Sequence, residues 1–277
     1  MSKINDFLKT MIGIFIIIYI APSIFFSLKK QWAYSLENHN KIGYLSIDGN
    51  MSQTSYYKKH LTNYFKDNSI KAILLKIESD GGPLGSCQAL AYDIENLKKE
   101  FPKPIISYTE NICISGAYQI AAATDYIVAT GSSIIGNIGM STTPAHTITE
   151  LIVNNNSSLP HDAIKHNEIT EHQQAMLQSL ADNTYQQLTK EIAAKRHLQL
   201  SKIDQWGQGK LFTGQQAYDL KLIDAMGSKT TAINLIKKNI IPSDRKIEWV
   251  TPTSQGFIAI LFDNNHEEDA DLDGHYL

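Results

Sequence analysis

One serine, Ser115, lies in a pattern with clear chemical meaning, Cys113-Ile114-Ser115-Gly116-Ala117-Tyr118. It falls between a predicted apolar strand, Pro104–Tyr108, and an apolar helical run, Tyr118–Ala123. Upstream, the glycine-containing turn Ser79–Gly82 ends another predicted strand. Acyl transfer needs a nucleophile on one turn and backbone N–H groups for an oxyanion on another. The two turns together therefore predict acyl-transfer chemistry.

The segments that flank these turns predict an α/β domain. Strand-like and helix-like patterns alternate, which indicates a mostly parallel sheet flanked by helices. Ala72–Ile77 is almost continuously apolar, as expected of a strand buried on both faces. The predicted strands are Ile42–Asp48, Ala72–Ile77, Pro104–Tyr108 and Tyr126–Thr130, and the predicted helices are Tyr56–Asn68, Cys87–Glu100 and Tyr118–Ala123.

The second half of the chain has a different pattern. Gly131–Gly139 is rich in glycine and serine and is predicted to be a loop, and Ile169–Arg196 is predicted to be one long polar helix with an apolar residue every three to four positions. Glu267–Asp273 is strongly acidic and is expected to be a solvated end of the chain. We expect residues 41–240 to form the main domain and residues 241–277 a C-terminal extension with this acidic tail.

The N-terminal segment predicts a membrane anchor in residues 1–30, followed by a linker in residues 31–40. Met11–Leu28 contains no charged residue and is close to the minimum length of a spanning helix, about 17 residues. Pro22 would kink such a helix without preventing insertion. A cleaved signal peptide is the alternative, but the small-x-small cleavage pattern is poor here. Lysines flank the segment on both sides, so charge leaves its orientation undecided.

Composition narrows the classes of function. The chain has 277 residues and a formal net charge of -3, which argues against nucleic acid as the main partner because phosphate binding needs a basic surface. Its two cysteines, Cys87 and Cys113, lie in apolar contexts and are expected to be buried free thiols. Two cysteines cannot form a zinc cluster by themselves, and we expect neither a cofactor nor a metal.

Taken together, the motifs resemble a known family. Their order and spacing between about Ile42 and Lys238 are similar to those of the signal peptide peptidase A, or S49, family of serine proteases in the ClpP/crotonase superfamily. The resemblance rests on Ser79–Gly82, Pro104–Tyr108, Ile114–Tyr118, Ala122–Ala129, Ile134–Gly139, Gly209–Ala217 and Leu220–Gly227. It implies a ClpP/crotonase-like fold, and an N-terminal membrane anchor is also typical of the family.

The resemblance implies a serine–lysine dyad. Ser115 matches the nucleophile, Gly82 falls at the position whose N–H lines the oxyanion hole, and Gly116 is a second candidate for that role. The chain departs from the family's Ser-Pro-Gly-Gly-Gly turn, because Asp80 replaces the proline and Pro83 replaces a glycine. Proline has no N–H, so a third donor from that position is excluded.

Lys165 corresponds to the lysine base that the resemblance requires. It is the only lysine between Lys103 and Lys190, although the family's phrase around this residue is absent. A lysine accepts a proton only when neutral, so its pKa would have to fall from about 10.4 to roughly 7–8. The alternative is a surface lysine beside His161 and His166 at the start of a helix.

Two other polar residues could take part in the chemistry. His146 could serve as a base for Ser115, but no carboxylate is spaced to orient it, so a polar loop histidine is expected. Asp80 could bind a metal or a substrate, but it is expected to complete its turn by accepting from backbone N–H groups.

The expected function is a membrane-anchored serine endopeptidase that degrades signal peptides or other unfolded apolar peptides. The resemblance implies a ring-like homo-oligomer in the inner or cytoplasmic membrane, and we expect the catalytic domain on the extracytoplasmic side. Two alternatives remain open: an inactive scaffold or inhibitor of the same fold, and a crotonase-type acyl-CoA enzyme. A capsid-maturation or stomatin-associated protease is a variant of the main interpretation.

Overall fold

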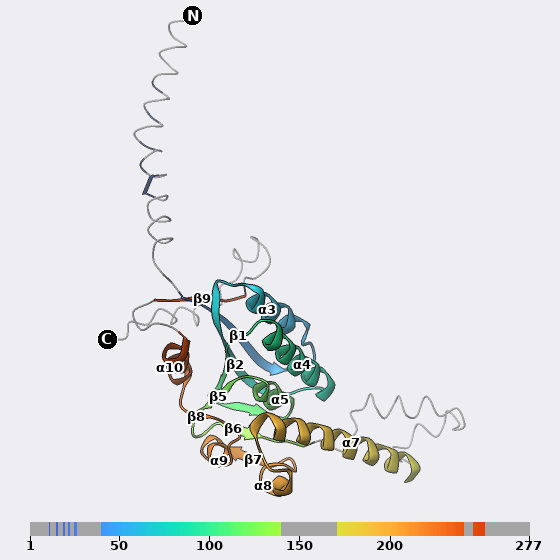
Figure 1. Ribbon diagram of the computed structural model, residues 1–277. Coiled ribbons are helices and arrows are strands. Elements are labelled where there is room, and N and C mark those ends of the chain that lie inside the picture. Colours follow the sequence, from blue (N-terminus) through green and yellow to red (C-terminus); the bar gives the residue numbers. More distant parts are fainter. Residues whose placement is uncertain are drawn as a thin grey trace, which may run out of the picture. The chain divides into compact units, whose positions relative to one another are not determined.

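The computed structural model describes residues 40–139, 171–240 and 246–252, together with six single residues between Met11 and Phe26 (Figure 1). The chain divides into two compact units, Met1–Asn40 with Asp244–Glu248, and Lys41–Ser243 with Trp249–Leu277. Apart from those six residues, the predicted anchor lies outside the described residues, as does the acidic tail. None of the helices in the described ranges combines the length and the hydropathy needed to cross a membrane.

The described residues alternate strands and helices as predicted. The strands are β1 (Asn40–Asn50), β2 (Ile70–Gly81), β3 (Ile105–Thr109), β4 (Ile112–Ile114), β5 (Tyr126–Ala129), β6 (Ile134–Gly136), β7 (Leu211–Thr213), β8 (Ala225–Met226) and β9 (Ile247–Val250). The helices are α3 (Ser55–Lys66), α4 (Leu84–Glu100), α5 (Gly116–Ala122), α7 (Glu171–Arg196), the 3-10 turn η3 (Leu200–Lys202), α8 (Ile203–Trp206), α9 (Gly214–Asp219) and α10 (Lys229–Ile240).

The sheet is mostly parallel, which confirms the predicted α/β class. Its strands follow the order β7-β6-β4-β2-β3-β5-β8, and β1 pairs with β2. The pair β6–β7 is antiparallel, whereas the other pairs on this path and the pair β1–β2 are parallel. The long strand β2 pairs with β1 along most of its length and with β3 over Ile73–Lys76, and near its end it pairs with β4 through Ser79↔Cys113. This change of partner brings the ends of β2 and β4 together.

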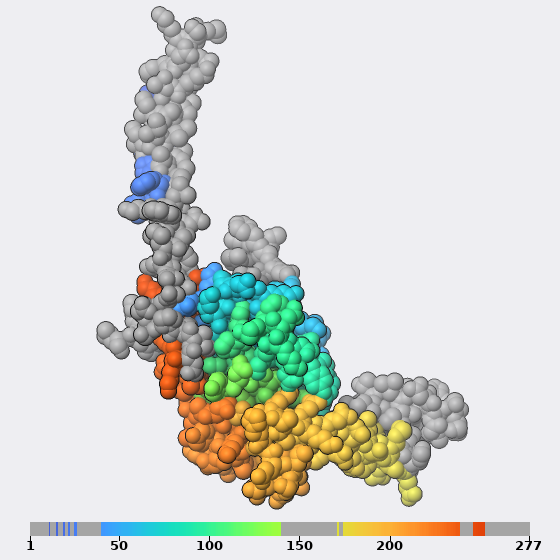
Figure 2. Space-filling view, viewed as in Figure 1, coloured from blue at the N-terminus to red at the C-terminus, as the bar shows by residue number. Residues whose placement is uncertain are grey.

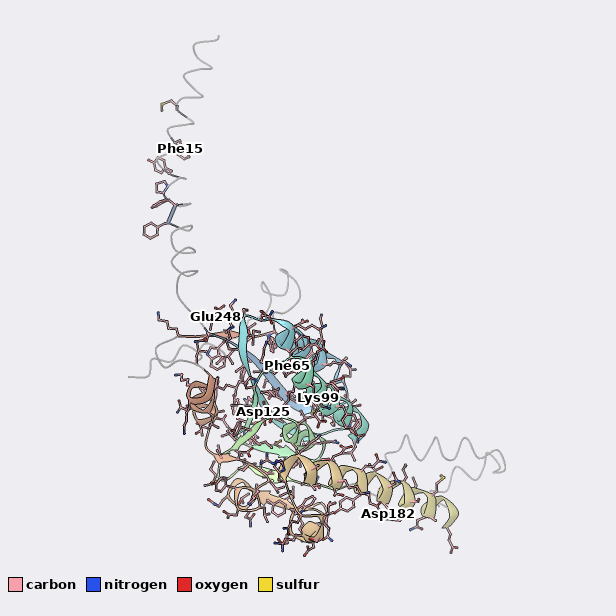
Figure 3. The ribbon with its side chains drawn as sticks, in the orientation of Figure 1. Phe15, Phe65, Lys99, Asp125, Asp182 and Glu248 are labelled. Carbon is pink, nitrogen blue, oxygen red and sulfur yellow. The ribbon has the colours of Figure 1, made fainter. Side chains whose placement is uncertain are left out.

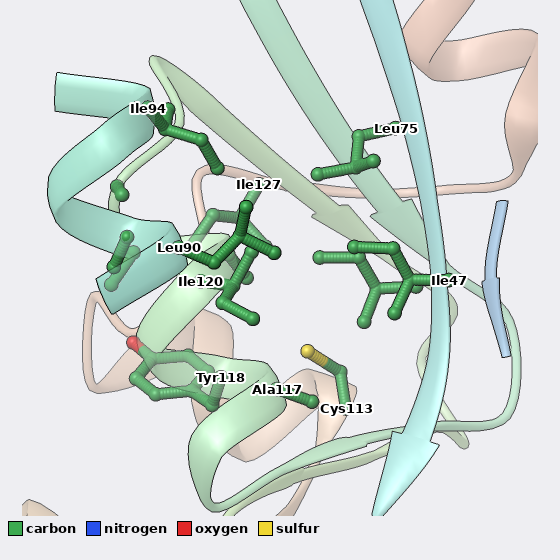
Figure 4. Packing of buried hydrophobic residues seen from close by; sticks show 14 of the residues in the cluster. Ile47, Leu75, Leu90, Ile94, Cys113, Ala117, Tyr118, Ile120 and Ile127 are labelled. Carbon is green, nitrogen blue, oxygen red and sulfur yellow. The ribbon is translucent and has the colours of Figure 1, made fainter. Parts of the chain in front are cut away.

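Helices cover the sheet on both sides. In Figure 1, α3 and α4 lie on one side of β2 and α10 on the other. Helix α5 packs inside the domain, where each of its residues is buried. Figure 4 shows Ala117 and Tyr118 of α5 among apolar side chains from α4 and the strands, including Leu90 and Ile47. Small residues in α5 let the neighbouring backbones approach closely, so the helix that follows Ser115 is held on all sides.

One predicted helix boundary and one predicted loop were wrong, and one short strand was not predicted. Helix α4 begins at Leu84 rather than Cys87, because Pro83 at its N-cap has a φ of -54° that suits the start of a helix. The segment Gly131–Gly139 was predicted as a loop but contains strand β6, and strand β4 was not predicted. Both strands have three residues, which is too short for a periodic pattern to reveal them.

The long helix α7 confirms the predicted helical segment, but only its C-terminal half packs against the rest of the domain. Leu188 and Ile192 in its C-terminal half are buried, whereas Met176 and Leu180 in its N-terminal half are 46% and 50% exposed. The N-terminal half projects from the body of this unit (Figure 2), and Asp182 lies on the projecting part (Figure 3). The apolar spacing of the first half therefore does not correspond to a buried face within the described chain.

A partly buried ion pair attaches the end of α7 to the sheet. The Arg196 guanidinium donates to both carboxylate oxygens of Asp224, at 3.0 and 2.9 Å. Asp224 also accepts from the Ile127 backbone N–H at 2.7 Å, and the Arg196 side chain is only 7% exposed. One carboxylate therefore joins α7, strand β5 and the segment before β8.

Candidate active site

Ser115 occupies a sharp turn between a strand and a helix. It directly follows β4 and is the N-cap of α5, with φ 57° and ψ -127°. A non-glycine residue at such a positive φ is strained by about 1–3 kcal/mol, and such residues cluster at active sites. The strain is held by two bonds: the Ser115 N–H donates to the Gly136 carbonyl at 2.9 Å, and the Gln119 N–H donates to the Ser115 carbonyl at 3.2 Å. The side chain is partly exposed, as a nucleophile on such a turn should be.

The glycine turn after β2 is held by its neighbours. Gly81 has φ 100°, a value that favours glycine, and its N–H donates to Ser79 Oγ at 3.0 Å. Ser79 Oγ in turn donates to the Gly49 carbonyl, and the Gly81 carbonyl accepts from the Met51 N–H at 2.9 Å. The prediction that Asp80 completes this turn was wrong, because among the described residues the serine before it makes that bond and Asp80 is exposed.

The two turns are in direct contact. A Cβ placed on Gly81 would lie 2.9 Å from the Gly116 nitrogen and 3.1 Å from Ser115 Cβ. A Cβ on Gly116 would lie 3.6 Å from the Gly82 carbonyl oxygen. The fold thus brings together Ser115, Gly82 and Gly116, three of the four residues predicted for the site. Lys165, the fourth, lies outside the described residues, as does His146.

Two backbone N–H groups at this junction have no hydrogen-bond partner among the described residues. They are the N–H groups of Gly82 and Gly116. The trans peptide that joins Gly81 to Gly82 directs its carbonyl toward Met51, so its N–H points the opposite way. A Cβ on Gly82 would lie 2.9 Å from the Met51 carbonyl carbon, so glycine is also required there for close packing.

The two thiols near Ser115 are not competing nucleophiles. Both cysteines are free and buried, as predicted. Cys87 Sγ lies beneath Gly116, only 2.5 Å from where a Cβ of that residue would stand. Burial raises the pKa of the Cys87 thiol to about 11 and raises the pKa of Cys113 as well. Both sulfurs are therefore protonated near neutral pH, and the thiolate is the reactive form.

Two site neighbours were missed by the sequence interpretation. Gln119, one helical turn after Ser115, is 1% exposed and donates through Nε2 to Glu191 Oε2 at 3.1 Å. Gln119 is the one amide side chain in an otherwise apolar helix, and that contrast was the available signal. Glu191 gave no comparable signal, since it lies among other polar residues of α7. Within the described ranges, no group of three or more metal-binding side chains is present.

The sequence of this chain was compared with protein families and with known proteins. The family model "Peptidase family S49" matches residues 97–240. A candidate protease of Methanocaldococcus jannaschii is 31% identical over 75% of this chain and 68% of its own length. A candidate signal peptide peptidase of Enterococcus faecium is 23% identical over 83% of this chain and 73% of its own length.

Among solved structures, a ClpP1 point mutant from Listeria monocytogenes aligns with a TM-score of 0.47 and 13% identity. The alignment covers 69% of this chain and 94% of that one. The family match spans the turn at Ser115, helix α5 and α7, and the similarity to the archaeal relative extends over 75% of the chain. This chain belongs to peptidase family S49, a family of serine peptidases.

Proposed function

We propose that this chain is a membrane-anchored endopeptidase in which Ser115 is the nucleophile and Lys165 the general base. The observation that carries the proposal is the contact between two turns. One presents Ser115 at φ 57° on a strand-to-helix junction, and the other leaves the Gly82 N–H without a partner within the described ranges. A nucleophile beside unpartnered backbone donors is the arrangement that acyl transfer requires.

The proposed reaction proceeds through an acyl-enzyme. Ser115 Oγ attacks the carbonyl carbon of the scissile peptide while neutral Lys165 takes the hydroxyl proton. The N–H groups of Gly82 and Gly116 donate to the oxyanion of the tetrahedral intermediate. The Lys165 ammonium then gives its proton to the leaving amine as the C–N bond breaks. Water, deprotonated by the same lysine, attacks the Ser115 ester, and the proton returns to Ser115 as the product acid leaves.

The proposed substrates are signal peptides or other unfolded apolar peptides near a membrane. The uncharged segment Met11–Leu28 supports an anchor that keeps the active site at the bilayer surface. The name of the Enterococcus relative supports the same class of substrate. We further propose a homo-oligomer in the inner or cytoplasmic membrane, with the catalytic domain on its extracytoplasmic side.

An activity-based probe tests the nucleophile. The full chain in mild detergent is treated with a fluorophosphonate, digested and mapped by mass spectrometry. One adduct is expected, on Ser115, because only a hydroxyl activated by a base and an oxyanion site attacks the phosphorus quickly. Protein denatured by heat serves as the control and should not react. An adduct on another residue would contradict the assignment, and a folded protein that neither labels nor cleaves peptides would favour the inactive scaffold.

Replacing Lys165 by alanine tests the base. We expect kcat/KM for peptide cleavage to fall by about 10²–10⁴-fold, the usual contribution of general acid–base catalysis. In the wild type, kcat/KM should rise with pH to a plateau, because only the neutral amine accepts the proton. Lys202→Ala, at an exposed lysine of η3, is the matched control and should leave both the rate and the pH profile unchanged. Full activity in Lys165→Ala would assign the base to another residue.

A further inference from the structure

The carboxylate of Glu191 is a meeting point for three helices. It projects from α7 and accepts from two side chains of α4, Gln88 Nε2 at 2.8 Å and the Tyr92 hydroxyl. It also accepts from Gln119 Nε2 of α5 at 3.1 Å. Hydrogen bonds to an ionised carboxylate are stronger than those between neutral groups. One side chain therefore fixes α4 and α5 against α7.

Both helices that Glu191 holds also hold the turn at Ser115. Gln119 lies one turn into α5, and its backbone N–H donates to the Ser115 carbonyl at 3.2 Å. On α4, Gln88 directly follows Cys87, whose Sγ packs against Gly116. The carboxylate thus reaches the catalytic turn along two routes, one behind Ser115 and one beneath Gly116.

Gln119 is buried, so its hydrogen bond to Glu191 determines how its side chain is oriented. The side chain is 1% exposed, and its Oε1 has no hydrogen-bond partner within the described ranges. The bond from Nε2 to Glu191 is accordingly the one polar contact that orients this amide among the described residues. Without the carboxylate, a buried amide would have to reorient directly behind a serine held in a strained conformation.

We propose that Glu191 is a positioning residue for Ser115, a role that rests on the proposed function of Ser115 as the nucleophile. Glu191 does not contact the substrate in this proposal. It holds the α4–α5 packing that keeps Ser115 Oγ and the Gly116 N–H in the geometry for attack. Because small displacements of reacting groups reduce rates steeply, its loss should lower kcat rather than raise KM.

The same helices offer a matched control. Lys195, one turn after Glu191 on α7, forms an ion pair with Glu95 of α4 at 2.6 Å. This pair also joins α7 to α4, but neither residue contacts α5 through an ion pair or hydrogen bond among the described residues. If the α7–α4 contact acted only through stability, loss of Lys195 and loss of Glu191 would have similar effects. Positioning of Ser115, in contrast, should depend on Glu191 alone.

The test compares Glu191→Ala, Glu191→Gln and Lys195→Met in the full chain. Glu191→Ala should lower kcat and the rate of fluorophosphonate labelling by about tenfold to a hundredfold, with KM changed little. Glu191→Gln should recover most of the rate, because its amide keeps one acceptor oxygen and the Gln119 amide can turn to present its own. Lys195→Met should lower the unfolding temperature while it labels at the wild-type rate.

Several results would overturn the proposal. Glu191→Ala could label at the wild-type rate, or Lys195→Met could lose labelling as strongly as Glu191→Ala does. If Glu191→Ala does not fold, Gln119→Met removes the link to α5 and Gln88→Met the link to α4. A wild-type labelling rate in both of these variants would also reject the role. Failure of the proposed function is a separate outcome, since the wild-type protein itself would then not label at Ser115.

Discussion

Ser115→Ala should lose peptide cleavage, with kcat falling by a factor on the order of 10⁴ or more. Removal of a serine nucleophile leaves only the residual catalysis provided by the oxyanion site and by substrate binding. The measurement is steady-state cleavage of a fluorogenic apolar peptide, together with fluorophosphonate labelling of the same sample. Labelling should disappear in parallel, because the hydroxyl that forms the adduct is absent.

The matched control is Ser179→Ala, at an exposed serine on the projecting half of α7. It should retain both activities. A second variant, Ser115→Gly, provides a signature of the turn itself. Glycine adopts φ 57° without the strain that a side chain causes, so Ser115→Gly should be more stable than Ser115→Ala by about 1–3 kcal/mol. Turnover within tenfold of the wild type in Ser115→Ala would mean that another residue is the nucleophile.

Asp224→Ala should destabilise the fold by about 3 kcal/mol, the lower end of the usual cost of breaking a buried ion pair, because Arg196 is buried whereas Asp224 is 28% exposed. Arg196 is 7% exposed and would keep a charge without a carboxylate partner, with the Lys221 carbonyl and the Tyr118 hydroxyl as its remaining neighbours. The Ile127 N–H would also lose its acceptor. For a domain of this size, the unfolding temperature should drop by roughly 10 °C, measured by thermal denaturation of the full chain in detergent.

The double variant Arg196→Met/Asp224→Ala is the informative control. Removing both charges leaves no buried cation without a partner, so this variant should recover part of the stability that Asp224→Ala loses. The favourable interaction of the pair is then the difference between the sum of the single effects and the double effect. If the double variant is as unstable as the two single changes added together, Arg196 and Asp224 do not interact energetically.

The sequence carried enough local information to predict the segments that form the candidate active site. The apolar run of β2 and the turns at Gly81 and Ser115 could be predicted because each has a local signal. Continuous apolar residues indicate a buried strand, periodic apolar residues indicate a helix, and glycines mark the turns between them. The pairing of Ser115 with Gly82 came from the family resemblance, and the structure places both turns in contact. The identity of the base stays a prediction, because Lys165 lies outside the described residues.

The tertiary structure decided the features that depend on distant partners. Strands β4 and β6 have three residues each and exist because β4 pairs with the end of β2 and with β6, and β6 also pairs with β7. Glu191 meets Gln119 across 72 positions and Gln88 across 103, so no local window contains that cluster. The acceptor for the Gly81 N–H was also decided by the fold. Ser79, rather than Asp80, is directed inward at the point where β2 pairs with β4, so Ser79 Oγ accepts this bond. Periodicity and propensity act within about one turn or one strand, whereas the convergence of polar side chains is set by the parallel connections of the sheet, and only the folded chain reveals it.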